Sequence, residues 1–140
     1  MKVTIFKNVY EKKAPHHIQL ETALKRIQSG KSGSLIAQVR DGNKETKKKL
    51  PVVLFSGEFS SRADEALFEH SGFIVLDFDH VDVEATKTAL ATDSYVHSCW
   101  VSPSGDGIKA LVQITNPERH RDHFRALTTY FDKQYGLEVD

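Results

Sequence analysis

Runs of apolar residues divide the chain into short strands and helices. Phe73–Phe78 is apolar and rich in β-forming residues, which predicts a buried strand. The elements expected after it are a helix over 82–91, strands over 95–101 and 108–114, a helix from Pro117 to a cap at Gly136, and a strand over 137–140. This β-α-β-β-α-β order is that of a ferredoxin-like or RRM-like core over about residues 73–140.

Weaker patterns precede that core and predict a smaller α/β region over residues 1–62. Its expected elements are an edge strand at 3–6, helices over 18–27 and 34–39, and a buried strand at 51–55. The expected fold class is therefore α+β, with both regions in a single domain spanning 1–140. Because the chain stops inside its last expected strand, we expect it to be a fragment of a longer protein.

The composition is that of a soluble globular protein, with 39% hydrophobic and 27% charged residues. No apolar run is long enough for a membrane span or a signal peptide, so we expect no membrane partner. Cys99 is the only cysteine, which excludes an internal disulfide and suits a reducing cytoplasm. Basic and acidic residues balance at 19 each, so any nucleic acid must be held by a local patch, a bound metal or another part of a longer protein.

The main candidate for chemistry is the acidic pair Asp77 and Asp79. Alternation along a strand places both side chains on one face, opposite Phe78. Two carboxylates about 6–7 Å apart at the end of a strand can bracket a hard cation such as Mg²⁺. A turn or capping role would explain Asp79, but not Asp77, which follows an uncharged run. We therefore expect a divalent-metal site here.

The expected topology brings further polar residues to this pair. The first strand of the core would lie between the third and the fourth, antiparallel to both, so its end would meet Lys109 and Asp140. The turn before Lys109 could direct hydroxyl and backbone N–H groups at an anion, through Ser102, Ser104, Gly105 and Gly107. Most such turns are only hairpin loops. Opposite the acidic pair, this one is expected to cradle a triphosphate, with Lys109 reaching phosphate.

Three segments together resemble the VirE N-terminal domain family: 50–57, 71–80 and 101–109. The resemblance covers nearly the whole chain. That family occurs in bacteria, phages and mobile elements and looks related to the archaeo-eukaryotic primase superfamily, the primase-polymerases. The resemblance implies a role in DNA replication, with nucleoside triphosphates, a DNA or RNA template, and a helicase or further primase domain as partners.

The same resemblance implies a nucleotidyltransferase that works by two-metal phosphoryl transfer. Asp77, Asp79 and Asp140 would hold Mg²⁺ or Mn²⁺, which activate a 3′-hydroxyl and stabilise the leaving pyrophosphate. Ser104, Gly105, Gly107 and Lys109 would grip the incoming triphosphate. Lys109 departs from the family because it stands where a histidine is expected. It can bind phosphate, but the substitution leaves open whether the domain is an enzyme.

Two other functions stay open. A non-catalytic module that binds nucleotide or nucleic acid within a replication protein is favoured by Lys109 and by the neutral net charge. A phosphatase of the haloacid dehalogenase type also begins with a strand ending in Asp-x-Asp, but little sequence follows Asp79 for that layout. The lysines within 44–49 are expected to form a solvated loop or helix end rather than a template contact. His80 adjoins Asp79 and could tune the site.

Overall fold

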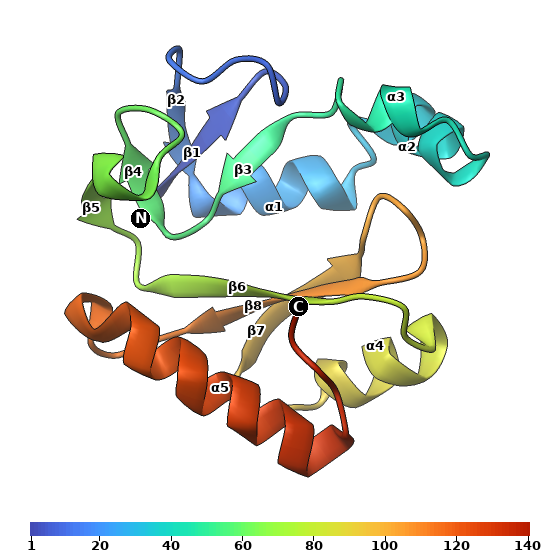
Figure 1. The fold of residues 1–140 in the computed structure, drawn as a ribbon, viewed down its shortest axis with the longest axis vertical. Coiled ribbons are helices and arrows are strands. Elements are labelled where there is room, and N and C mark those ends of the chain that lie inside the picture. Colours follow the sequence, from blue (N-terminus) through green and yellow to red (C-terminus); the bar gives the residue numbers. More distant parts are fainter. The chain divides into compact units, whose positions relative to one another are not determined.

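The computed structural model describes all of residues 1–140, and the chain forms two compact units, Met1–Ser71 and Gly72–Asp140 (Figure 1). The first contains β1 (Lys2–Phe6), β2 (His16–Gln19), α1 (Leu20–Gln28), α2 (Gly33–Arg40), α3 (Lys44–Lys47), β3 (Val52–Leu54), β4 (Gly57–Phe59) and β5 (Leu67–His70). The second contains β6 (Phe73–Phe78), α4 (Val83–Ala91), β7 (Val96–Val101), β8 (Ile108–Gln113) and α5 (His120–Tyr135). None of the helices combines the length and apolar character that a bilayer crossing requires.

Two antiparallel sheets build the first unit, one with strand order β2-β1-β3 and one that pairs β4 with β5. The hydroxyl of Thr4 on β1 is fully buried and joins the two sheets. It donates to the Gly57 carbonyl oxygen and accepts from the Phe59 amide, both at 2.8 Å. Because the hydroxyl is satisfied both as a donor and as an acceptor, it can be buried without an unpaired hydrogen-bonding group. The buried apolar residues of this unit are Val3, Phe6, Leu20, Ala23, Leu50, Phe55 and Phe59.

The sequence prediction for this unit needs several corrections. The strand expected at an edge, β1, is the central strand of its sheet, and β3, expected to be buried, is half-buried. The helix expected from residue 18 begins at Leu20, because Ile18 pairs with Val3 in the antiparallel β1–β2 ladder. Strands β4 and β5 were not predicted at all. Each is three or four residues long and carries a glutamate at a paired position, Glu58 opposite Glu69. Such short strands depend on pairing with distant residues, which local patterns do not report.

The second unit is a three-stranded antiparallel sheet of order β6-β8-β7, with α4 and α5 on one face (Figure 1). Ile74, Leu76 and Phe78 of β6 are at most 1% exposed and share one buried cluster with Leu90 of α4 and Phe131 of α5. Alternation along the strand thus turns these three residues toward the helices. The expected α+β fold class is confirmed.

The chain beyond α5 departs from the expected core. Helix α5 follows a 3₁₀ turn, η2 (Pro117–Arg119), and ends at Gly136, whose φ of 65° is the left-handed conformation that favours glycine. Residues 137–140 do not form the expected fourth strand. A backbone hydrogen bond from the Asp140 amide to the Asp77 carbonyl oxygen, at 2.8 Å, nevertheless places this segment beside the end of β6.

A carboxylate clasp fixes the end of α5. The buried Asp93, in the turn between α4 and β7, accepts hydrogen bonds from the hydroxyls of Tyr130 and Tyr135, at 2.6 and 2.5 Å, and from the Tyr95 amide at 2.8 Å. Burial by itself raises the pKa of Asp93, but the two hydroxyls and the neighbouring amides outweigh it and hold that pKa below its usual value. The clasp therefore anchors the helix end from which the chain runs to Asp140.

Candidate functional site

Asp77 and Lys109 are direct partners across the β6–β8 ladder, so their side chains leave the sheet on the same face. The Lys109 Nζ lies 2.5 Å from the Asp77 Oδ1, with the two side chains 32% and 41% exposed. In this partly solvated setting the pair contributes about 0.2–1 kcal/mol to stability. Its larger consequence is chemical, because the lysine that was expected to bind phosphate is engaged by a carboxylate.

Asp79 and Asp140 meet where β6 ends. The hydrogen bond between the two carboxyl groups raises the pKa of Asp79, and burial and the charge of Asp140 add to this effect. His80 and Lys109 act in the opposite direction without cancelling it. Two touching carboxylates cannot both stay ionised without a free-energy cost, so this pair favours a shared proton or a bound cation. We call Asp77, Asp79, Asp140 and Lys109 the carboxylate rim.

Gly107 lets the β7–β8 loop pack closely against the rim. A Cβ atom at this position would lie 2.9 Å from the Phe78 carbonyl oxygen and 3.2 Å from both the Asp79 Oδ1 and the Ser102 Oγ. The loop itself is closed by backbone bonds from the Ser102 amide to the Gly107 carbonyl oxygen and from the Gly105 amide to the Ser102 carbonyl oxygen. A glycine is needed here because of close approach.

Asp106 organises the remainder of this loop, a role that the sequence did not indicate. It accepts from the Ser104 hydroxyl at 2.8 Å and pairs with the His80 Nδ1 at 2.7 Å. The Ser104 bond, aided by His80, lowers the pKa of Asp106. His80 is the one non-glycine residue with positive φ, at 54°. The His80–Asp106 pair thus joins the turn after β6 to the loop and fixes both.

These contacts change the expected triphosphate cradle. The Ser102 and Ser104 hydroxyls lie 3.1 Å apart within the loop, and Ser104 is turned toward Asp106. With Asp106, the rim and its loop hold four carboxylates but only one lysine and one histidine. The resulting field is negative, so a bare triphosphate would be repelled unless it arrived with its own cations.

A protein-built metal centre of three carboxylates, as expected from the sequence, is wrong for this chain. No group of three or more His, Cys, Asp or Glu side chains in residues 1–140 is arranged to hold a metal ion. The physical reason lies at Asp77, where the Lys109 ammonium occupies the place beside the carboxylate that a metal ion would take. Asp79 and Asp140 remain as a pair of oxygen donors. Two carboxylates suffice for Mg²⁺ only when phosphate oxygens and water complete its octahedron.

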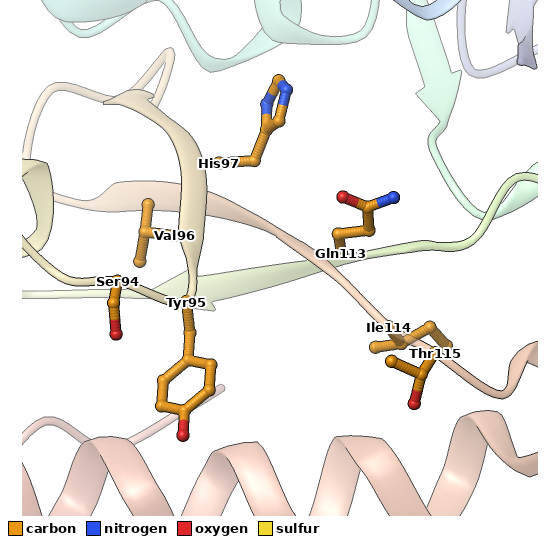
Figure 2. A pocket seen from close by; sticks show the side chains of 7 residues that line it. All are labelled: Ser94, Tyr95, Val96, His97, Gln113, Ile114 and Thr115. Atoms are coloured by element: carbon orange, nitrogen blue, oxygen red, sulfur yellow. The ribbon is translucent and has the colours of Figure 1, made fainter.

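A separate open hollow lies at the other end of the β7–β8 pair, lined by Ser94, Tyr95, Val96, His97, Gln113, Ile114 and Thr115. In Figure 2, His97 and Gln113 extend from one side of the strands and Tyr95 and Thr115 from the other. Since these polar groups do not converge on one point, the hollow lacks the arrangement of a small-molecule site. The carboxylate rim therefore stays the candidate site.

The family model described as "BT4734-like, N-terminal domain" matches residues 45–139. The chain belongs to this family. The BT4734-like match corrects the resemblance inferred from the sequence, because it is to neither the VirE N-terminal family nor a primase-polymerase family. The Asp-x-Asp and Ser/Gly motifs behind that inference also suit other folds with a strand followed by a tight turn. No curated protein and no solved structure matches the chain.

Proposed function

We propose that this BT4734-like domain binds a nucleoside triphosphate together with Mg²⁺ or Mn²⁺ at the carboxylate rim. The observation that carries the proposal is the place of Asp140 beside the end of β6. Its amide donates to the Asp77 carbonyl oxygen at 2.8 Å, and its carboxyl group is near enough to Asp79 to raise the pKa of that residue. The nearby lysine and histidine are each paired elsewhere, Lys109 with Asp77 and His80 with Asp106. A nucleotide-bound metal ion supplies the missing positive charge.

The chemistry of Mg²⁺ fits this division of ligands. Mg²⁺ keeps several waters and is usually held by one or two carboxylates and by substrate phosphates, rather than by a cage of protein ligands. Asp79 and Asp140 would supply the protein ligands of the ion, and the β- and γ-phosphates and water would supply the others. The negative field of the rim makes binding of nucleotide and cation mutually dependent. Either partner alone binds weakly.

Nucleotidyl transfer to a 3′-hydroxyl is the catalytic form of this proposal, with the cation polarising the phosphate. Nucleotide binding without chemistry is the second candidate. It is favoured by the Lys109–Asp77 ion pair, which keeps the lysine from the phosphates. Either form suits a replication protein in the cytoplasm, where the half-buried Cys99, its pKa raised by burial, stays reduced.

Isothermal titration calorimetry of the full chain tests the proposal. ATP with Mg²⁺, ATP with a chelator, and Mg²⁺ alone are titrated into the wild type, Asp79→Asn, Asp140→Asn and the control Asp132→Asn, an exposed carboxylate of α5. We expect binding only in the first arm, at least tenfold weaker in both rim variants and unchanged in the control. Equal binding by Asp79→Asn and Asp132→Asn would refute the site.

Primer extension with labelled nucleotides then separates the two forms. Incorporation that is lost in Asp79→Asn supports transfer, whereas metal-dependent binding without incorporation supports the binding module. Release of phosphate from a phosphomonoester, abolished by Asp77→Asn, would instead point to the phosphatase alternative.

A further inference from the structure

The neutral net charge hides an uneven distribution of charge along the chain. Residues 1–49 contain twelve Lys and Arg but only four Asp and Glu, whereas the second unit contains six basic and eleven acidic residues. All twelve basic side chains lie at least partly in solvent, and all but Arg26 are exposed. A surplus of exposed positive charge in one part of a protein is the electrostatic footprint of a polyanion ligand.

The structure gathers part of this surplus into one surface. The Val9 amide donates to the Lys48 carbonyl oxygen at 3.4 Å, which brings the β1–β2 loop against the end of α3. Lys12 and Lys13 lie on the loop, and Lys47, Lys48 and Lys49 lie at the end of α3. We call these five lysines the basic surface. They are all exposed.

An exposed aromatic side chain lies within the basic surface. Tyr10 is 67% exposed and close enough to Lys48 for its charge to raise the pKa of that lysine, after the larger effects of the Glu45 hydrogen bond and charge. The acidic residues nearby are Glu45, 3.2 Å from Lys48, and Glu11, whose side chain accepts from the Lys13 amide. Glu45 offsets one lysine, so the surface remains strongly positive.

We propose that the basic surface binds single-stranded nucleic acid, with the lysines along its phosphates and Tyr10 stacked on an unpaired base. Exposed lysines beside a solvent-facing aromatic ring match the recognition of single strands, in which a cationic track follows the backbone and bases stack on rings. The elements at this surface are a loop and a four-residue helix, which offer no long helix for the groove of a duplex. The site lies within the first unit and is independent of the carboxylate rim.

Fluorescence anisotropy of the full chain with labelled oligothymidylate and oligouridylate of about twenty nucleotides tests the proposal, over roughly 25–200 mM salt. Five phosphate contacts predict a slope of log K against log salt near roughly −3.5 for a single strand. Lys47→Gln/Lys48→Gln/Lys49→Gln should bind at least tenfold more weakly at the low-salt end and reduce the slope to roughly −1.4. Tyr10→Ala should weaken binding about fivefold or more with the slope unchanged.

The matched control is Arg119→Gln/Arg121→Gln/Arg125→Gln, which removes three exposed positive charges from the second unit. It should bind like the wild type. Equal affinity for the two oligonucleotides assigns recognition to the phosphates and pyrimidine ring faces that they share, and tighter binding of one shows that the sugar or the thymine methyl group also contributes. The proposal is overturned if neither binds, if the arginine variant loses as much affinity as the lysine variant, or if anionic phospholipid vesicles displace the oligonucleotide at equal charge concentration.

Discussion

Gly107→Ala is the most informative single substitution, because it adds one methyl group at the point where the β7–β8 loop contacts the end of β6. The new Cβ would lie 2.9 Å from the Phe78 carbonyl oxygen, whereas ordinary contacts lie at 3.4–4 Å. The backbone must therefore move by about half an ångström. Phe78 pairs with Ile108 in the β6–β8 ladder, so that movement is resisted by the sheet.

Overpacking of this kind costs about 1–3 kcal/mol. For a unit the size of residues 72–140, each kcal/mol lowers the unfolding midpoint by about 4–8 °C. Differential scanning calorimetry should therefore show a fall of at least about 4 °C in Gly107→Ala. The same methyl also meets the Asp79 Oδ1 at 3.2 Å, so Mg²⁺-dependent ATP binding should weaken in the same variant.

Gly33→Ala is the matched control. It makes the same chemical change at the start of α2, where a Cβ meets nothing within 4 Å, and should leave the midpoint unchanged or raise it slightly. If Gly107→Ala unfolded within a degree of Gly33→Ala and bound ATP normally, the close contact between loop and strand, and with it the geometry of the rim, would be refuted.

Three further predictions concern stability. The pKa of Asp93 is lowered in the folded state, so its carboxylate stabilises the fold above the unfolded pKa of about 3.9, and this stabilisation is lost as the pH falls through the folded pKa. Melting curves from neutral pH to about pH 3 should therefore show a smaller fall of the midpoint in Asp93→Asn than in the wild type. The pKa of Asp79 is raised in the folded state, so the ionised carboxylate destabilises the fold at pH 7. Asp79→Asn should melt at a higher temperature than the wild type at pH 7, and the difference should shrink in acid. An unchanged or lower midpoint at pH 7 would contradict the carboxyl contact. Leu76→Ala removes a fully buried side chain of β6 and should cost about 2–5 kcal/mol, measured by urea unfolding, and a loss below about 1 kcal/mol would contradict its place in the core.

The second unit was the more predictable half of the fold, for a physical reason. Its strand β6 opens with four consecutive apolar residues, α4 begins after Asp82, whose side chain accepts from the Ala85 amide, and α5 ends at a left-handed glycine. Local residues set each of these boundaries. In the first unit, β2 and β5 exist because distant residues pair with them, so helical spacing extended wrongly back to Ile18.

The candidate site was also only partly predictable from the sequence. That Asp77 lies beside Lys109 follows from strand order and register, which the sequence pattern is able to predict. Which partner each side chain then contacts depends on local geometry, which strand order and register do not determine. Lys109 closes onto Asp77, and Asp106 takes both His80 and Ser104, although nothing in the spacing of these residues indicates such bonds.

The Asp77–Lys109 pair has a consequence for how the sheet assembles. The two residues are opposite one another in the β6–β8 ladder, and slipping β8 by one residue would place Ile108 or Ala110 opposite the carboxylate and turn the ammonium toward the helices. The ion pair thus marks one alignment of the two strands and penalises its neighbours. A homologue without a basic residue at this position needs another way to hold the alignment. Exchanging the two residues, as Asp77→Lys/Lys109→Asp, should keep the alignment while reversing the charges that a ligand meets.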